Sequence, residues 1–563
     1  MRWTISAAPK PETITALSTA LQVDHIIASL LIQRGIDTYE KAKTFFRPSL
    51  DDLYDPFLMK DMDKAVARIE QAVLDGERIL IYGDYDVDGT TSVALVSTYL
   101  KSYYDQVTTY IPDRYVEGYG VSIRGIDYAI DNDITLIIAL DCGIKAIDQI
   151  QYAKEKGVDF IVCDHHRPGN TLPDAVAVLD PKREDCEYPY KELCGCGVGF
   201  KLLSALSRKR NQQFTTLLPY LDLVVTAIAA DIVPITDENR TLAYFGLRQL
   251  NQAPRTGFKA IIQQLKKEEL TITDVVFVIA PRINAAGRMK HGNHAVSLLT
   301  ETDYTTACMY AQEIEQFNTD RRDTDAQITK EALLQIEQSG EKDRNTTVVF
   351  DTDWHKGVIG IVASRLTETY YRPTIVFTQS GDKLAASARS VKGFDVYNAI
   401  EACSDHIEQF GGHKYAAGLT LLPENYEAFK NAFENEVATT IDKHLLVPEI
   451  KIDMVIDLQE ITPKFYRILK QFAPFGPGNM NPTFMTKNLV DTGYGKKVGA
   501  DQTHLKVSVT NHEKGQHIGG IGFNLGDKYD RITNKQRFMA VYAVDENEWN
   551  NKVSLQLRIK DIK

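Results

Sequence analysis

The chain is poor in the residues that mark several classes of protein. It has 7 cysteines and 3 tryptophans in 563 residues. A sparse and odd set of cysteines argues against a disulfide framework. Cys186, Cys194 and Cys196 lie close together in the sequence, but their spacing differs from the Cys-x-x-Cys pairs of zinc sites. We therefore predict buried or incidental thiols, with neither disulfides nor structural zinc.

Segments that would place the chain in a membrane or make it a molecular motor are also missing. No apolar run approaches the roughly 20 residues that span a bilayer. The N-terminus lacks the apolar core of a secretory signal. A Gly-x-x-x-x-Gly-Lys-Ser/Thr phosphate loop is absent from the sequence, which disfavours a helicase. We expect a cytoplasmic protein with no membrane partner.

An excess of positive charge is missing as well. The 64 Lys and Arg residues are outnumbered by 76 Asp and Glu, which gives a net charge of −12. Proteins that bind nucleic acid usually carry a basic footprint. Metal-site carboxylates, offset by divalent ions, would explain part of the deficit. The basic residues that can line a channel for a single strand are Arg282, Arg288, Lys290, His291, Arg321, Arg322, Arg365, Arg372 and Arg389.

The chain is too long for one hydrophobic core, and its composition is that of a globular protein. Hydrophobic residues make up 44% and charged residues 25%. Alternating strand and helix patterns predict a doubly wound parallel sheet, and short β-type runs between Gly, Asn and Asp turns predict a small barrel. We predict five parts: a helical leader at 1–55, an α/β domain at 56–250, a helical connector at 251–345, a second α/β domain at 346–442 and the barrel at 443–563.

Four clusters of acidic and imidazole residues each follow an apolar run. The clusters are Asp84, Asp86 and Asp88; Asp141; Asp164, His165 and His166; and Asp231. The runs before the first three, at 78–82, 134–140 and 159–163, predict buried strands, and residues 218–230 predict a buried helix. Thr90 or Thr91 is expected to cap the helix after the first cluster. Since chemistry collects at the carboxyl ends of parallel strands, we expect the clusters to meet in one crevice.

Such a crevice would need divalent cations. Carboxylates held close together raise one another's pKa, and cations remove that conflict. Oxygen-rich ligand sets with one or two imidazoles suit Mn²⁺ or Mg²⁺. Asp88 and Asp141 are candidates to bridge two ions, an arrangement that clamps the attacking and leaving oxygens at phosphorus. The residues alone therefore predict a metal-dependent phosphoesterase.

These motifs resemble the four motifs of the DHH phosphoesterase superfamily, and most closely its RecJ branch of single-strand-specific 5′-to-3′ DNA exonucleases. The motifs lie at 84–92, 141–144, 164–166 and 230–234, with further matches at 111–114, 117–120, 281–288, 354–365, 387–390 and 411–413. The resemblance covers about residue 30 to the C-terminus. It implies a two-lobed α/β fold, in which a parallel-sheet DHH domain and a smaller DHH-associated domain are joined by a long helix. A C-terminal oligonucleotide-binding barrel would follow.

The resemblance also implies roles at the metal centre. The ligands of two Mn²⁺ or Mg²⁺ ions would be Asp84, Asp86, Asp88, Asp141, His165 and Asp231. Asp84 fits least well, because many relatives place a histidine ligand slightly upstream, where this chain has Tyr82. His166 would contact the scissile phosphate, and Asp141 and Asp164 would act in catalysis, Asp164 either as a ligand or by orienting an imidazole. The alternatives are a solvated acidic loop, a structural histidine and, for Asp231, an ordinary helix-end residue.

Substrate contacts implied by the resemblance come from both lobes. Arg114, Ser387 and Arg389 would form a pocket for the terminal 5′-phosphate, since a guanidinium can grip a phosphate through two parallel hydrogen bonds. A surface salt bridge is the alternative for these arginines. Arg282, Asn284 and Arg288 would contact the strand. His413 would touch the substrate backbone or pack in the core, and His355 is equally open.

The resemblance predicts an exonuclease of DNA repair and recombination that acts from the 5′ end of single-stranded DNA. It further implies single-strand-binding protein and a repair helicase as partners, and we expect a monomer that ends at the barrel. One alternative is a DHH hydrolase of short oligoribonucleotides or cyclic dinucleotides, although those relatives are usually shorter and need no barrel. A catalytically silent DNA-binding scaffold is the other, although such proteins typically lose ligands.

Overall fold

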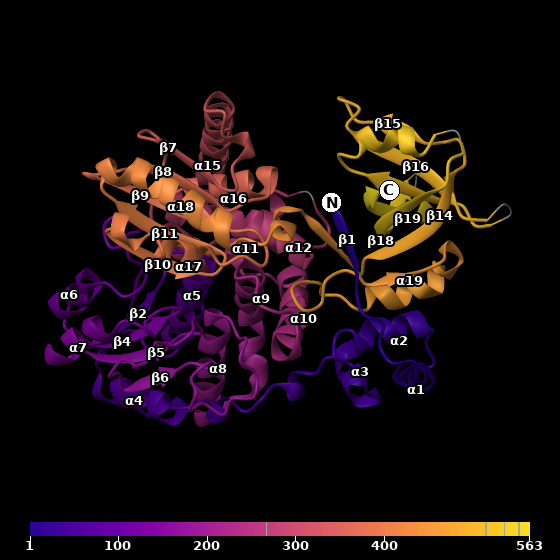
Figure 1. Ribbon diagram of the computed structural model, residues 1–563. Coiled ribbons are helices and arrows are strands. Elements are labelled where there is room, and N and C mark those ends of the chain that lie inside the picture. The colour runs from indigo at the N-terminus through magenta and orange to yellow at the C-terminus, as the bar shows by residue number, and fades with distance from the viewer. Residues whose placement is uncertain (266, 513–514, 534, 550–551) are drawn as a thin grey trace.

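The computed structural model describes residues 1–265, 267–512, 515–533, 535–549 and 552–563. Two bodies lie side by side (Figure 1). The larger body contains both α/β sheets and the long connector helix, and the smaller one combines the N-terminal helices with the C-terminal barrel. Helix α10 (Asp237–Gln252) lies on the side of the larger body that faces the smaller one.

The catalytic sheet is parallel throughout and runs in the order β3-β2-β4-β5-β6. Its strands are β2 (Arg78–Gly83), β3 (Val107–Tyr110), β4 (Ile134–Leu140), β5 (Asp159–Cys163) and β6 (Ala177–Leu179). Alternate residues enter opposite cores, Ile79 and Ile81 on one face and Leu80 and Tyr82 on the other. Both faces are therefore covered, which explains why the central strands β2, β4 and β5 are largely apolar without alternation. The predicted doubly wound sheet is confirmed.

Helices of this domain flank the sheet. They are α4 (Met62–Asp75), α5 (Val87–Lys101), α6 (Ile123–Asp131), α7 (Ile147–Glu155), α8 (Gly195–Lys209), α9 (Leu221–Ala230) and α10. Helices α5 and α8 begin beside the clusters, whereas α9 ends there. The predicted capping of α5 by Thr90 or Thr91 is wrong: the helix begins at Val87, and the Asp86 carboxylate accepts the Gly89 N–H at 3.0 Å. A short aspartate directly before the first helical residue is the better cap. The helix predicted to end near Asp231 is present as α9.

The connector is helical and ends in a long helix. It contains α11 (Thr256–Gln263), α12 (Ile272–Asp274), a π-helical turn at Val275–Ile279, α13 (Ala280–Met289), α14 (Asn293–Thr300) and α15 (Tyr304–Gln338). At 35 residues, α15 is about 50 Å long. Its first half contributes to the core of the catalytic domain, and its second half packs against the second lobe.

The second lobe is a mixed sheet in the order β10-β11-β9-β8-β7, in which β7 and β8 are parallel and the other pairs antiparallel. The strands are β7 (Thr347–Asp351), β8 (Thr374–Ser380), β9 (Lys383–Arg389), β10 (Gln409–His413) and β11 (Ala416–Leu421). Helices α16 (Ile359–Tyr370), α17 (Val396–Glu401) and α18 (Tyr426–Thr440) cover it. The predicted two-lobed architecture joined by a long helix is confirmed.

The C-terminal strands form a barrel in the order β13-β14-β18-β19-β17-β16-β15, which a β14–β16 pairing closes. They are β13 (Met454–Val455), β14 (Phe484–Asp491), β15 (Lys496–Val498), β16 (His504–Thr510), β17 (Ile518–Gly522), β18 (Phe538–Trp549) and β19 (Lys552–Ile562). Helix α19 (Pro463–Lys470) packs beside them. The predicted barrel is therefore confirmed.

The N-terminal leader is part of the barrel unit. Strand β1 (Arg2–Ile5), which the sequence prediction missed, pairs in parallel with β12 (Glu449–Ile452). Helices α1 (Pro11–Leu21), α2 (His25–Ile32) and α3 (Tyr39–Phe46) share one hydrophobic core with α19 and the barrel strands. The leader thus contains helices, as expected, together with one strand, and a four-residue edge strand leaves little periodic pattern in a sequence.

Within the described residues, no single helix is long and apolar enough to cross a membrane. The bent pair α1 and α2 passes that test only when the two helices are taken together, by length and composition.

Candidate metal centre

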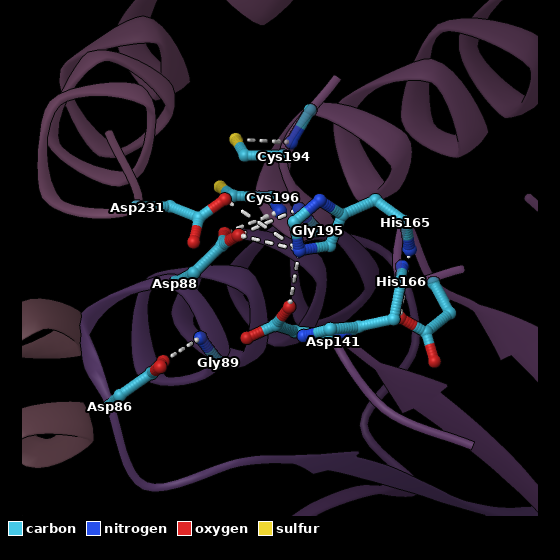
Figure 2. Close-up of polar contacts among 12 residues, drawn as sticks. Asp86, Asp88, Gly89, Asp141, His165, His166, Cys194, Gly195, Cys196 and Asp231 are labelled. Atoms are coloured by element: carbon cyan, nitrogen blue, oxygen red, sulfur yellow. Dashed lines mark hydrogen bonds and ion pairs between the residues drawn. The ribbon is translucent and has the colours of Figure 1, made fainter. Parts of the chain in front are cut away.

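The carboxyl ends of three neighbouring strands bring the acidic clusters together. Gly83 at the end of β2 is paired with Leu140, and Leu140 with Cys163. The residues that follow, Asp84, Asp141 and Asp164, therefore leave the sheet at one edge. Asp231 reaches the same place from the end of α9. Figure 2 shows Asp88, Asp141 and Asp231 around the His165 ring.

The His165 ring faces three carboxylates. Its Nε2 lies 3.2 Å from Asp141 Oδ1, 3.6 Å from Asp231 Oδ2 and 3.8 Å from Asp88 Oδ2 (Figure 2). Among the described residues, two sets of three side chains each have their potential ligand atoms within 4.8 Å of one another, and the two sets share His165. One is Asp141, His165 and His166, and the other is Asp88, His165 and Asp231. The structure thus places four of the six predicted ligands around one point.

The start of α8 fixes Asp88. The backbone N–H groups of Gly195 and Cys196 each donate to an Asp88 oxygen at 2.7 Å (Figure 2). A helix N-terminus carries partial positive charge and suits an anion. A Cβ at position 195 would lie 2.6 Å from the Asp141 Cβ, so only glycine fits there. Sequence reasoning missed this role, although a Gly-x-Gly pair at a helix start was the available signal.

Asp164 orients its neighbours. Its Oδ1 accepts the backbone N–H of His165 at 2.7 Å and lies 2.8 Å from His166 Nδ1, while Oδ2 accepts the Ile144 N–H at 2.9 Å. Burial alone would raise the pKa of Asp164, but these hydrogen bonds lower it to about 2. The same contact raises the pKa of His166 to about 9, although burial opposes the shift. The geometry favours the orienting role over the ligand role for Asp164.

Asp86 and Asp84 lie at the margin of this cluster. Asp86 caps α5, and Figure 2 shows it apart from the His165 ring. Asp84 is fully buried, and neither carboxylate oxygen has a hydrogen-bond partner among the described residues. Burial and the charge of Asp86 raise the pKa of Asp84 well above its usual value. Gly89 passes so close to the Asp84 backbone that a side chain there would overlap it.

The electrostatics of the cluster are those of a cation site. Burial, followed by neighbouring carboxylates, raises the pKa of Asp88 to about 7 and of Asp231 to about 8, and also raises that of Asp141. Burial lowers the pKa of His165 to about 3, so the ring is neutral and can act as a ligand. Both His165 nitrogens and Asp141 Oδ1 lack hydrogen-bond partners within the described part of the chain. Carboxylate oxygens with one imidazole fit Mn²⁺ or Mg²⁺.

The raised pKa values predict how the metal-free protein responds to pH. An unfolded aspartate titrates near 3.9, whereas Asp88 and Asp231 titrate near 7 and 8 in the fold. The stabilising protonation is complete below the unfolded pKa and is lost as pH rises through the folded values. We expect the melting temperature in EDTA to fall between about pH 4 and 8, the interval between the unfolded and folded pKa values, and Mn²⁺ affinity to rise over that range because metal displaces these protons. A melting temperature in EDTA that does not change with pH would contradict this charge assignment.

Three arginines from different elements lie near one another beside the metal cluster. Burial, then the charges of Arg114 and Arg389, lowers the pKa of Arg288 to about 9. Arg389 donates to Ser387 Oγ at 3.0 Å. A Cβ at Gly360, near the start of α16, would lie 2.9 Å from Ser387 Oγ and 3.1 Å from an Arg389 nitrogen. The pocket predicted from Arg114, Ser387 and Arg389 thus has a helix N-terminus beside it.

The remaining predicted substrate residues differ in their surroundings. His413 lies at the end of β10 with an exposed surface, and partial desolvation by its neighbours, followed by the charges of Arg389 and His166, lowers its pKa. The predicted alternative of a packed core histidine is therefore wrong for His413. The His355 ring packs edge-to-face on Tyr115 at 6.1 Å, and the Tyr115 hydroxyl donates to the Arg288 carbonyl. Asn284 is half-buried in α13.

Several predicted channel arginines are engaged elsewhere. Arg282 pairs with Glu315 at 2.6 Å, and Arg365 and Arg321 both approach Asp325. Arg372 is buried and donates to Thr347 Oγ1 and to the backbone carbonyls of residues 341, 342 and 344. The expectation that Arg372 follows a DNA strand is therefore wrong. A sequence shows the charge of an arginine but not its partners.

Comparisons with known proteins agree with this architecture. Three domain families match the chain: the DHH family N-terminal domain at 78–228, the DHHA1 domain at 343–439 and the RecJ OB domain at 452–561. The single-stranded-DNA-specific exonuclease RecJ of Bacillus subtilis is 38% identical over 100% of this chain and 70% of its own length. The Salmonella typhimurium protein of the same name is 33% identical over 90% of each chain.

Solved structures show the same arrangement. The crystal structure of RecJ with Mn²⁺ from Thermus thermophilus has a TM-score of 0.84 and 26% identity, and it covers 100% of this chain and 79% of that one. The corresponding structure with Mg²⁺ has a TM-score of 0.80.

Proposed function

Since the chain belongs to the RecJ family of single-stranded-DNA-specific exonucleases, we propose that it removes nucleotides from the 5′ end of single-stranded DNA by metal-dependent hydrolysis. The observation that carries the proposal is the His165 ring facing three carboxylates from separate elements: Asp88 at the start of α5, Asp141 after β4 and Asp231 at the end of α9. Two ions held there would need the oxygen-rich donors that Asp88, Asp141 and Asp231 offer, with Asp86 and Asp84 beside them.

The chain's own residues supply proton control and positioning. Mn²⁺ or Mg²⁺, when bound, would activate a water and offset charge on the phosphorus oxygens. The pKa of His166 near 9 keeps its ring protonated at neutral pH, so Nε2 can donate to a phosphate oxygen. Tyr119 OH, 3.2 Å from that nitrogen, supports the ring, and Asp164 holds it from the other side. The α8 N-terminus keeps Asp88 in place.

We assign the 5′ polarity to the pocket of Arg114, Ser387 and Arg389. An Arg389→Lys enzyme should lose the two-pronged grip on a terminal phosphate while keeping its charge. We expect about a tenfold loss in kcat/KM on a 5′-phosphorylated oligonucleotide, equivalent to about 1.4 kcal/mol, and little change on a 5′-hydroxyl one. Arg78→Lys, at an exposed arginine, is the matched control. Equal losses of kcat/KM on both substrates would show that this pocket does not recognise the terminal phosphate.

Strand selectivity would come from the two lobes and the barrel. Tyr115, Arg288 and His355 bring the lobes together beside the metal cluster, and Asn284 and Arg282 lie on the same helix as Arg288. We propose that a single strand passes between them, with His413 at its backbone and the barrel holding the strand further along. Partners would be single-strand-binding protein and a repair helicase in DNA repair and recombination. We propose a cytoplasmic monomer.

A time course on end-labelled DNA tests this function. Single-stranded and duplex substrates with either end blocked should show loss of nucleotides only from a free 5′ end of the single strand, and only with Mn²⁺ or Mg²⁺. Degradation from the 3′ end would overturn the polarity. Preferential turnover of a cyclic dinucleotide would favour the alternative of a DHH hydrolase of short oligoribonucleotides or cyclic dinucleotides. DNA binding without any cleavage would favour a catalytically silent scaffold.

A further inference from the structure

The barrel unit touches the catalytic domain directly beside Asp231. Residues 471–480, which connect α19 to the barrel, lie on residues 234–240, which follow Asp231 and open α10. The Ile235 N–H donates to the Pro477 carbonyl at 2.7 Å. The metal candidate and the docking segment are thus separated by only a few residues.

Two glycines permit this close approach. A Cβ at Gly476 would lie 2.5 Å from Ile235 Cγ1, and one at Gly478 would lie 2.8 Å from Thr236 Cγ2. Real Cβ atoms do not come so close to their neighbours. Any side chain in these two places would push the loop away from the segment.

Arg240, on α10 of the catalytic domain, stabilises the contact with the barrel unit. Its buried guanidinium donates to the Phe45 carbonyl at 2.9 Å, the Phe472 carbonyl at 2.8 Å and the Ala473 carbonyl at 3.0 Å. It also stacks on the Phe45 ring, with 3.8 Å between Cζ and the ring centroid. One side chain of α10 therefore binds both the N-terminal helices and the barrel loop.

Two cavities border the contact. One of about 570 Å³ is lined among others by Arg34, Thr236 and Gly478. The other, of about 770 Å³, is lined among others by Tyr244 and Phe475. The loop therefore touches the catalytic domain next to two hollows.

Ile232 shows that the segment after Asp231 is under strain. Its φ is +60°, a left-handed conformation that β-branched residues avoid. Its side chain is 63% exposed, so its own packing does not hold this conformation. A strained backbone persists only where the surrounding structure enforces it. The enforcing contacts are those of the following residues, where Tyr190 and Asn239 donate to the Pro234 carbonyl and the barrel loop binds Ile235.

We propose that Gly476, Gly478 and Arg240 are positioning residues for Asp231. Docking of the barrel unit holds residues 232–236 in the strained form that turns the Asp231 carboxylate toward His165 and Asp88. Placement of the barrel and loading of the metal centre are then coupled. This inference rests on the proposed role of Asp231 as a ligand.

Gly478→Ala tests the coupling. We expect about a tenfold weaker Mn²⁺ affinity by titration calorimetry, the scale seen when groups that orient a ligand are lost. Hydrogen exchange of residues 232–236 in the metal-free protein should rise as well. Thr236→Ser removes only the methyl group that the new Cβ would strike, so the double variant should regain most of the affinity.

Gly493→Ala is the matched control. Gly493 lies in the barrel with φ +96°, so alanine brings the same backbone strain, but its Cβ would meet no atom within 4 Å. Its Mn²⁺ affinity should equal that of the unaltered chain. Gly476→Ala, with Ile235→Ala as its rescue, gives a second pair if the first variant fails to fold.

Wild-type affinity in both Gly478→Ala and Gly476→Ala would overturn the proposal, whether or not exchange rises. Asp231→Asn separates this failure from a wrong site. If Asp231→Asn also binds Mn²⁺ normally, the ligand assignment itself is wrong. If it loses affinity while the glycine variants do not, only the coupling fails.

Discussion

Asp141→Asn is expected to abolish hydrolysis while the protein stays folded. Asp141 Oδ1 lies nearest to His165 Nε2, at 3.2 Å, and has no hydrogen-bond partner among the described residues. The carboxylate is therefore free to hold cations, and losing it should cost several kcal/mol of transition-state stabilisation, about 10³-fold or more in kcat. The stability of the metal-free protein at pH 8 should not fall. Burial and the charge of Asp88 raise the pKa of Asp141, so its ionised form is unfavourable in the fold and asparagine removes that charge.

Asparagine is the suitable replacement at this position. Asp141 has φ +59°, and asparagine tolerates that left-handed conformation, whereas alanine would add about 1–2 kcal/mol of strain. Asp133→Asn is the matched control, since Asp133 has φ +55° and its side chain is 92% exposed. Single-turnover cleavage and Mn²⁺ titration are the measurements. If Asp141→Asn retains metal-dependent cleavage, Asp141 is not an essential ligand of the metal centre.

Lys201→Met is expected to be the most destabilising single substitution that we predict, at about 3–5 kcal/mol. Lys201 Nζ lies 2.9 Å from Glu238 Oε1, and both side chains are almost fully buried. Glu238 also accepts the Tyr188 hydroxyl at 2.6 Å and the Tyr54 N–H at 2.8 Å. Without Lys201 the Glu238 carboxylate stays buried but loses its cationic partner. The folded state is therefore destabilised.

A double variant distinguishes the lost pair from lost packing. Lys201→Met with Glu238→Gln should recover most of the stability, because no charge is then left buried. Lys41→Met, at the exposed pair with Asp37, should cost at most about 1 kcal/mol. Urea unfolding is the measurement. A Lys201→Met cost as small as that of Lys41→Met would show that the pair contributes little.

The pair also bears on the metal centre through the helices that it joins. Lys201 lies on α8, whose first N–H groups hold Asp88, and Glu238 lies on α10, directly after the segment that follows Asp231. The pair thus joins α8 to α10 in the interior of the catalytic domain.

The catalytic sheet was predictable from the sequence because its central strands β2, β4 and β5 are largely apolar runs. Residues 79–82 enter cores on both faces, so their pattern needs no knowledge of a partner. The meeting of Asp84, Asp141 and Asp164 followed from the same rule, since parallel strands end at one edge. Domain boundaries and individual site roles stay predictions.

The parts that escaped prediction depend on contacts between distant segments. Gly195 and Cys196 bind Asp88 through backbone groups, which no side-chain motif records. Arg372 looked like a strand-binding cation but satisfies backbone carbonyls in the second lobe. Strand β1 exists only because β12, more than 440 residues away, offers an edge. Local pattern specifies none of these partners.

The most direct test of the account is anomalous diffraction at the manganese edge from crystals grown with Mn²⁺. We predict two peaks about 3.5–4 Å apart, the spacing of two-metal sites, with His165, Asp141, Asp88 and Asp231 as ligands. Peaks elsewhere, or none at this cluster despite measurable Mn²⁺ binding in solution, would contradict the central claim that these residues hold a pair of catalytic cations.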